Sequence, residues 1–344
     1  MRLGIALPHY DFSYPEPPRP GLATFDRVAG YADRAEALGF AQAWVSDHFW
    51  LDLSRYGGPA GRQDTPECWM LLAGLAARTS RIRLGSLVLA NGIRQPTLLA
   101  KMIATLDQVA GGRVDVGIGA GWNEPEYTEH ELEFPGAGER LARLEEAAAV
   151  IKTLLGGDVG SYRGHYYWAD RAPIVPGPVQ DPWPPLWIGG AGDRLLGVVA
   201  RVADGWNLAW RVEPGHYSER VAVLERRCAE VGREPGSVRR SVGLSTLVGR
   251  DADDLAERWR KLQAWAPGGA LDGVALRDWA AGRLVGTADE VVDQLGRWAA
   301  LGVEQVICSF ASLPFAVFDD DQLNLTAELV LPRLAEIAPA ASGR

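Results

Sequence analysis

The sequence predicts an α/β protein, a (β/α)8 TIM barrel with insertion loops at the carboxyl-terminal face. Short apolar runs alternate with helix-length segments along the 344 residues, and eight such units can be counted. The chain also opens and closes on similar units, ALGF before the strand AQAWVS and ALGV before the strand EQVICSF. Alternation of this kind favours a parallel sheet, and eight repeats favour a closed barrel. A doubly wound open sheet is the alternative.

Each expected strand is a short apolar run that ends in glycine or polar residues. The final strand follows a helix whose start is marked by Thr287 and Glu290, a T-x-x-E capping box. The first helix is expected over residues 24–38, where apolar residues recur on one face and Gly39 provides a C-cap. The strands are expected near residues 2, 41, 82, 113, 186, 205, 241 and 304, and further helices after Gln95-Pro96 and near residues 138–154, 192–203 and 215–231.

Three long connections interrupt the repeat, at residues 47–65, 155–185 and 265–285. We interpret them as insertions in one domain that spans residues 1–344, because a barrel of this size can use a single core. Connections this long are usually functional. The second contains Tyr166, Tyr167 and Trp168, and we expect it to lie over or beside the mouth of the barrel.

Composition limits the partners that the protein can have. A formal net charge of -9 argues against nucleic acid, and no apolar run approaches the length of a membrane span. The strand-like run LGIALP begins within one residue of Met1, without a charged leader followed by a hydrophobic plateau, and this predicts a cytoplasmic protein. The three cysteines are far apart and the five histidines lack HxH or HExxH spacing, so no metal is expected.

The sharpest catalytic hypothesis concerns the end of the second strand, where Asp47 and His48 follow WVS. Catalytic groups of this fold gather at the carboxyl ends of strands. A neutral imidazole there can move a proton or donate a hydrogen bond to an atom that gains charge. The alternative is a histidine that bonds a backbone carbonyl and packs. Asp47 is expected either to orient His48 or to cap the next turn.

Two glycine clusters follow other strands. GIGAGWNE, residues 117–124, lacks the G-x-G-x-x-G order of a dinucleotide site, and we expect its backbone to pass close to a flat ring. GGAGD, residues 189–193, stands between a strand and a helix, where backbone N–H groups and the helix dipole favour a phosphate. A tight turn without a ligand is the alternative for the second cluster.

Several segments, in this order along the chain, resemble the bacterial luciferase-like family: LGIALP, AEALGFAQAWVSDHF, TSRIRLGSLVLANGIRQPTLLAKMIATLDQVAGGRVDVGIGAGWNEPEY, PLWIGGAGDRLLGVVARVADGWN and VGTADEVVDQLGRWAALGVEQVI. The form S-D-H-F, residues 46–49, is similar to the branch that uses the deazaflavin coenzyme F420 in place of FMN. The resemblance implies a homodimer whose barrels hold a flavin-like ring at the carboxyl face for hydride transfer, while the protein supplies orientation and a proton.

Site residues follow from the resemblance by position. It places Asp47 and His48 beside the deazaflavin, and Leu87-Val88 behind the ring as a bulge with a non-prolyl cis peptide bond. The ring and ribityl chain are assigned to Gly119, Ala120, Gly121 and Asn123, and the phosphate to Gly189, Gly190, Ala191 and Gly192. The aromatic residues Tyr10, Trp50, Trp122 and Trp206 suit contacts with a flat or apolar substrate.

The sequence also departs from the sugar- and alcohol-oxidising relatives, which have a tryptophan and a glutamate where this chain has Asp52 and Trp122. Reduction of a C=C or C=N bond in a natural product is therefore as good an expectation as alcohol oxidation. The predicted function is an F420-dependent oxidoreductase with a small-molecule substrate. An FMN-dependent monooxygenase fed by a separate reductase and a flavin-binding protein without catalysis are the alternatives.

Overall fold

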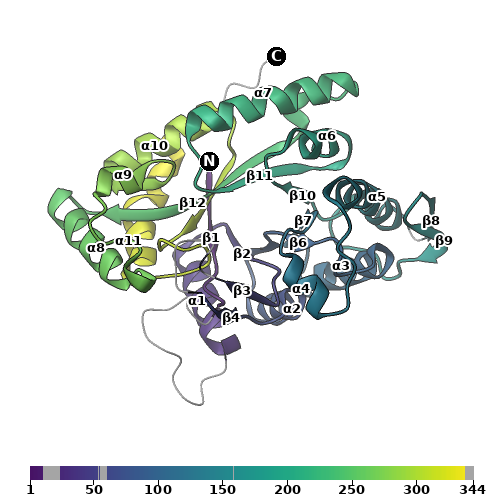
Figure 1. The fold of residues 1–344 in the computed structure, drawn as a ribbon, viewed down its shortest axis with the longest axis horizontal. Coiled ribbons are helices and arrows are strands. Elements are labelled where there is room, and N and C mark those ends of the chain that lie inside the picture. The colour runs from purple at the N-terminus through teal and green to yellow at the C-terminus, as the bar shows by residue number, and fades with distance from the viewer. Residues whose placement is uncertain (11–23, 53, 55–59, 158, 338–344) are drawn as a thin grey trace.

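The structure, a computed structural model, describes residues 1–10, 24–52, 54, 60–157 and 159–337. Eight parallel strands form a closed barrel, because β10 pairs with β7 as well as with β11 (Figure 1). All eight strand positions expected from the sequence are confirmed. The barrel strands are β1 (Arg2–Ala6), β2 (Gln42–Val45), β5 (Arg83–Ser86), β7 (Val114–Gly119), β10 (Leu186–Gly189), β11 (Gly205–Trp210), β12 (Arg239–Gly249) and β14 (Gln305–Ser309).

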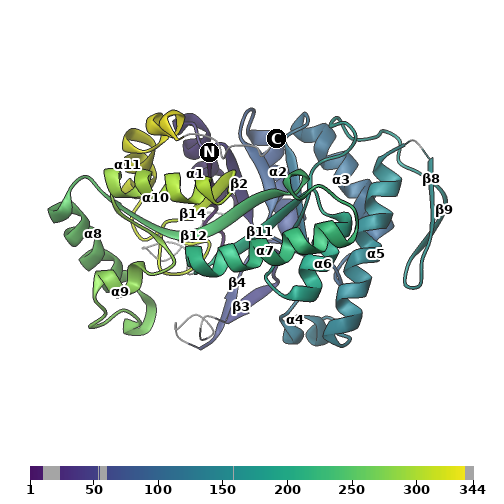
Figure 2. The ribbon, with the colours of Figure 1, turned by 90° about the horizontal axis from the view of Figure 1, so that it is seen from above.

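Helices surround the strands (Figure 2). The capping box of Thr287 and Glu290 begins α10 as predicted, and α3 ends at Gly111, whose φ of 62° is left-handed. Within the described ranges, no helix has both the length and the apolar character needed to cross a membrane. The expected helices are α1 (Thr24–Leu38), α3 (Pro96–Ala110), α5 (Ala137–Leu155), α6 (Asp193–Val202), α7 (Pro214–Glu230) and α10 (Ala288–Ala300); α2 (Cys68–Arg78), α8 (Ala252–Trp265) and α11 (Asp321–Leu329) are additional.

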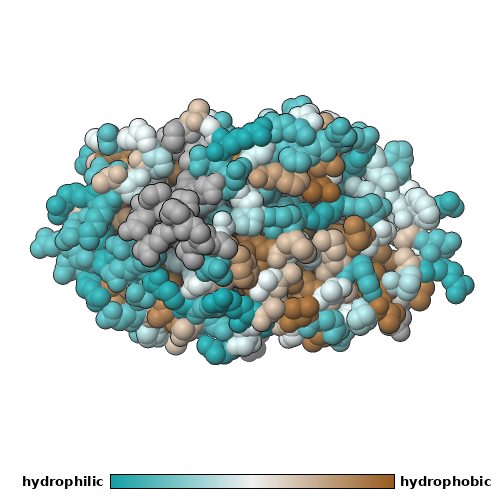
Figure 3. Space-filling view, turned by 90° about the horizontal axis from the view of Figure 1, so that it is seen from below, coloured by the Kyte–Doolittle hydropathy of each residue, from teal (hydrophilic) through white to brown (hydrophobic). Residues whose placement is uncertain are grey.

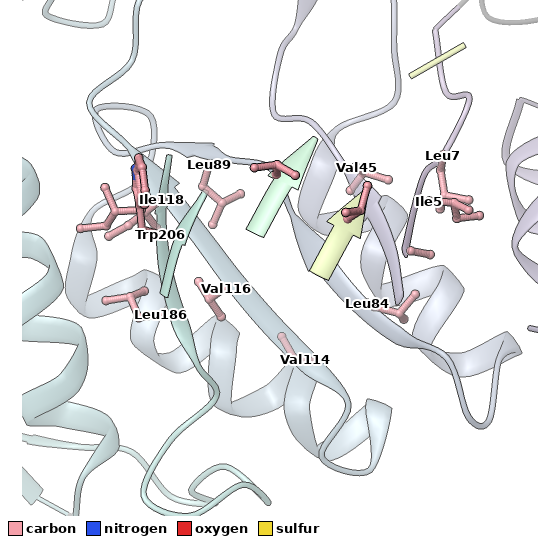
Figure 4. Close-up of a cluster of buried hydrophobic side chains, with 14 of the residues drawn as sticks. Ile5, Leu7, Val45, Leu84, Leu89, Val114, Val116, Ile118, Leu186 and Trp206 are labelled. Atoms are coloured by element: carbon pink, nitrogen blue, oxygen red, sulfur yellow. The ribbon is translucent and has the colours of Figure 1, made fainter. Parts of the chain in front are cut away.

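The core has an outer and an inner part, because successive residues of a strand face opposite sides. Outward residues such as Val45, Leu84 and Val116 pack against the helices (Figure 4). Inside the barrel, the buried rings of Trp44 and Trp187 meet edge to face at 6.2 Å. A Cβ on Gly85 would lie 2.4 Å from Trp44, so this strand position needs glycine.

The long connections contain structure of their own. The first forms the antiparallel hairpin of β3 (Trp50–Asp52) and β4 (Arg62–Asp64), although residues 53 and 55–59 of the 47–65 segment lie outside the described residues. The second forms the hairpin of β8 (Val159–Arg163) and β9 (Trp168–Pro173) against α5. The third contains α9 (Leu276–Ala280) and β13 (Leu284–Thr287), which extends β12. The β3–β4 hairpin and α4 (Glu124–Glu129) lie at one end of the barrel (Figure 2).

Candidate active site

A cavity opens at the carboxyl ends of β1, β2, β5 and β7. Its walls contain many of the residues expected at a site, together with several that the sequence did not single out, so the barrel brings together residues far apart in the chain. The expected ones are Tyr10, Asp47, His48, Leu87, Val88, Gly121, Trp122 and Asn123; the others include Ser46, Leu51, Glu126, Tyr127, Trp210 and Phe315.

His48 is held by a carboxylate from α4, the third helix after it in the chain. Its Nδ1 lies 2.8 Å from Oε2 of Glu126, and its ring meets Trp122 at 5.2 Å between centroids. The other oxygen of Glu126 accepts hydrogen bonds from the backbone N–H groups of Phe49, at 2.6 Å, and Trp50, at 3.2 Å. Glu126 therefore fixes both the imidazole and the turn that carries it.

The environment of Glu126 favours its ionised form. Burial alone would raise the pKa of this carboxyl, whose residue is only 2% exposed. The hydrogen bond and charge of His48, together with backbone N–H groups, outweigh burial and lower the pKa below its ordinary value. An ionised carboxylate can only accept, so Nδ1 of His48 carries the proton toward Glu126 and Nε2 is left for other partners.

Asp47 has a different role from the one expected of it beside His48. Both of its oxygens accept from the guanidinium of Arg94, at 2.7 and 2.9 Å, and Oδ2 also accepts from Ala90 N at 3.0 Å. Arg94 in turn pairs with Glu67. The described contacts of Asp47 include no bond to His48. Of the two expected roles, orienting the histidine is wrong because Glu126 does so; Asp47 instead ties β2 to the segment after β5.

A second hydrogen-bonded group reaches the cavity from β1. Tyr10 Oη lies 2.6 Å from Ser46 Oγ, and Ser46 also contacts His9, whose Nε2 accepts from Ser46 N at 3.1 Å. His9 Nδ1 lies 2.7 Å from Thr65 Oγ1. Burial, with a smaller contribution from the charge of His48, lowers the pKa of His9 to about 3. His9 is therefore neutral in ordinary buffers.

The Leu87–Val88 peptide bond is cis, as the resemblance implied. The Val88 side chain packs against three glycines. A Cβ added to one of them would lie close to the Val88 side chain, at 2.9 Å for Gly117, 2.7 Å for Gly119 and 3.1 Å for Gly189. These glycines make room for the side chain of Val88. Val88 lines the cavity and the three glycines do not, so they influence a ligand there only through Val88. Gly121, with φ of 76°, instead leaves space for the Tyr127 hydroxyl.

The predicted phosphate turn lies between β10 and α6. Gly190 has φ of 132°, its N–H donates to Asn207 O at 3.1 Å, and its carbonyl accepts from Trp206 Nε1 at 2.7 Å. Gly192 is the N-cap of α6, and a Cβ there would meet nothing within 4 Å. The described lining of the cavity does not include this turn, although Gly189 contacts Val88. Ala120 lines a neighbouring hollow with Asn91, Arg140 and Tyr167.

Of the four aromatic residues expected to contact a substrate, two line the cavity and two lie elsewhere in the structure. Tyr10 and Trp122 line the cavity. Trp206 is fully buried and stacks on Tyr217 at 5.3 Å, so its assignment as a substrate residue is corrected to core packing. Trp50 lies on the β3–β4 hairpin, where its Nε1 donates to Glu129 at 3.1 Å and Arg62 covers its ring; this anchors the hairpin to α4.

Glu126 is a candidate site residue that sequence reasoning missed. WNEPEY offers two glutamates directly after the fourth strand, and Pro125 indicates the first turn of a helix there. That signal would have placed a carboxylate near the strand ends. It would not have chosen Glu126, which is buried, over Glu124, which is exposed, because this depends on the direction in which α4 leaves the barrel.

Comparison with known proteins adds a family. The model of the luciferase-like monooxygenase family matches residues 1–305. The chain is 31% identical to a phthiodiolone/phenolphthiodiolone dimycocerosates ketoreductase of Mycobacterium kansasii, over 94% of this chain and 83% of the other. It is 30% identical to an F420-dependent glucose-6-phosphate dehydrogenase of Microbacterium testaceum, over 87% and 90% of the two chains.

Among solved structures, coenzyme F420-dependent tetrahydromethanopterin reductase of Methanopyrus kandleri superimposes with a TM-score of 0.73. The match covers 96% of this chain and 99% of the other, at 22% sequence identity. At this identity, the likeness supports the barrel fold alone.

Proposed function

Because this chain belongs to the luciferase-like monooxygenase family, we propose that it is an F420-dependent oxidoreductase that transfers a hydride between the deazaflavin and a small organic substrate. Two relatives support the cofactor and the reaction class: one is named as an F420-dependent dehydrogenase and the other as a ketoreductase. The observation that carries the proposal is the His48–Glu126 pair in a largely apolar cavity at the carboxyl end of the barrel.

The residues present suit a flat ring with a polar edge. Leu87, Val88 and Leu89 form an apolar wall on one side of the cavity, and the aromatic rings of Trp122 and Trp210 add flat surfaces. Gly121 and Asn123 also line the cavity. When bound, the deazaflavin supplies or accepts the hydride, and the protein residues hold the substrate and move its proton.

A carbonyl/alcohol couple fits this site better than the C=C or C=N bond expected from the sequence. The case against carbonyl chemistry was a missing tryptophan, at Asp52, and a missing glutamate, at Trp122. Glu126 supplies a carboxylate to His48 from α4, and the indole of Trp122 meets the His48 ring at 5.2 Å. In reduction, the hydride adds to the carbonyl carbon, the π pair moves to oxygen, and protonated His48 donates a proton to that oxygen. Glu126 stabilises the imidazolium before the transfer.

Titration of the purified protein with F420 and with FMN, followed by fluorescence quenching or calorimetry, tests the cofactor. Our proposal expects tight binding of F420 and at least tenfold weaker binding of FMN. The family's monooxygenases give the alternative, an FMN-dependent enzyme supplied by a separate reductase. Preferential binding of reduced FMN would establish that alternative and overturn the F420 assignment.

We further propose that the protein is a homodimer, as the sequence resemblance implied. On the outer helices, Met70 is 64% and Leu98 is 58% exposed, and both are apolar side chains that a second copy would cover. Figure 3 shows apolar side chains gathered on the face seen from below, toward which α2 lies in Figure 1.

A further inference from the structure

Two arginines lie close together beyond the carboxyl end of β11. Arg211 follows β11 directly, and the backbone N–H of Val212 donates to Gly282 O at 2.9 Å, which brings Arg283 to the same place. Gly282 has φ of 71°, and a Cβ there would lie 3.2 Å from Arg211 Cγ, so this glycine leaves room for the arginine side chain. We call Arg211 and Arg283 the arginine pair.

The charge of the arginine pair is not balanced by the residues that the structure describes, since neither side chain forms an ion pair with any of them. Arg283 donates only to neutral groups, the carbonyls of Trp279 and Ala281, and covers the Trp279 ring at 4.9 Å. Burial, followed by the charge of Arg211, lowers the pKa of Arg283 to about 10. Arg94, in contrast, holds two carboxylates. An anion beside the pair would offset both burial and repulsion.

The arginine pair lies across the mouth of the barrel from His48. In the closed strand order, β11 is four strands away from β2 in either direction, so the ends of these two strands face each other. Trp210, the residue before Arg211, lines the same cavity as His48. Figure 2 shows that α9, just before Arg283, extends toward the same end of the barrel as α4 and the β3–β4 hairpin. A molecule that reacts beside His48 can therefore extend toward the pair.

We propose that the arginine pair binds an oxyanion of the substrate, a phosphate or carboxylate group remote from the carbon that exchanges the hydride. Guanidinium groups present planar sets of N–H donors that match such oxyanions. The oxyanion is held and not transferred, so the reaction at His48 is unchanged. The inference rests on the proposed function and narrows its substrate class to anionic carbonyl or alcohol compounds. The cofactor's phosphate has the same chemistry, so the experiment must separate the two sources.

Calorimetric titration of the purified protein with inorganic phosphate tests the site. Arg211→Gln should weaken phosphate roughly tenfold or more, because a charge-assisted hydrogen bond is lost, and the exposed position of Arg211 leaves folding intact. Arg283→Lys keeps the charge without the planar fork and should also weaken phosphate, though less. Arg260→Gln, at an exposed position on α8, removes the same charge elsewhere and should bind phosphate like the natural protein.

The same titration of the F420-loaded protein separates the two sources of phosphate. The loaded cofactor fills its own phosphate site, so inorganic phosphate should still bind, and Arg211→Gln should still weaken it. Phosphate binding that F420 abolishes would assign the pair to the cofactor and overturn the inference, as would equal phosphate affinities for Arg211→Gln and Arg260→Gln. Failure of F420 itself to bind would instead overturn the proposed function, while the titration of the unloaded protein still tests the pair.

Discussion

At the scale of single residues, the hydrogen-bonding partners of each side chain at the site determine what that side chain can do. Glu126 holds His48 and two backbone N–H groups, Asp47 holds Arg94 and Ala90, and His9 holds Ser46. By these contacts, His48 is the group that can exchange a proton, while Asp47 and His9 hold the walls of the cavity in place. Three predictions follow from these different roles.

Replacement of His48 by Ala or Asn should leave folding and F420 affinity nearly unchanged and lower turnover about 10²- to 10⁴-fold, the usual contribution of a positioned acid or base. Steady-state kinetics with the carbonyl or alcohol substrate, beside a cofactor titration, measures both effects. A variant with the natural rate constant would reduce His48 to a packing residue.

Replacement of Glu126 by Gln should lower turnover with little loss of F420 affinity, because the neutral amide no longer stabilises protonated His48. A hydrogen bond to a charged group contributes about 1.5–3 kcal/mol, which corresponds to roughly 10- to 150-fold in rate. The control is Glu124→Gln, since Glu124 is exposed in the same turn. Equal rates for the two variants would contradict the role of Glu126.

His9 should make stability fall as the pH is lowered. Its folded-state pKa of about 3 lies below the ordinary 6.5, so the unfolded chain binds a proton at higher pH than the folded chain does. The stability that neutral His9 contributes is therefore complete above pH 6.5 and is lost as the pH falls toward 3. Between pH 7 and pH 5 the free energy of unfolding should drop by about 2 kcal/mol from this group. Urea unfolding at the two pH values measures it, and His9→Gln should remove most of the difference.

Sequence alone reached His48 and Tyr10 because each follows an apolar strand, the position where this fold gathers functional groups. The sequence could not identify Glu126 or Arg94 as site residues, because their partners, His48 and Asp47, lie 78 and 47 residues away in the chain. Trp206 shows the opposite error. It was expected at the site, but it is the second residue of β11, far from the carboxyl end of that strand, and its side chain points outward into the layer between strands and helices.

At the scale of elements, periodicity and caps located the barrel strands and six helices, since each buries a regular face. The short elements could not be predicted from the sequence, for physical reasons. β13 is not a strand of the barrel repeat but pairs with the second half of β12, and α4 has six residues with no side-chain cap at Asn123. The two hairpins depend on cross-strand pairing, which a single strand pattern does not specify.

The turn before α6 should bind the phosphate of the cofactor through backbone N–H groups. Gly190→Val should therefore weaken F420 much more than a phosphate-free deazaflavin, because a side chain strains a residue with φ of 132° and meets Leu195 at 3.1 Å. Calorimetry with both ligands compares the losses. Gly215→Val is a control at an open position in α7, where a Cβ meets nothing within 4 Å. Equal losses for the two ligands in Gly190→Val would place the phosphate elsewhere.

At the scale of the whole molecule, the closed barrel leaves apolar side chains such as Leu98 exposed on its outer helices. The proposed dimer predicts that Leu98→Asp, on α3, shifts the protein toward monomer, because a charge would be buried in the contact. Light scattering after size exclusion measures the mass. Val231→Asp, at the end of α7 and 45% exposed, is the control and should keep the mass of the natural protein. A natural protein that is monomeric at micromolar concentration would overturn the dimer.

The contacts of α4 couple the catalytic pair to the β3–β4 hairpin. Glu126 holds His48 and the start of β3, while Glu129, one turn later, holds Trp50 and Arg62 of the same hairpin. The helix and the hairpin therefore form one mechanical unit at the entrance. The imidazole and the hairpin thus share one anchor, so a substitution that frees α4 from the hairpin should also loosen the carboxylate that holds His48.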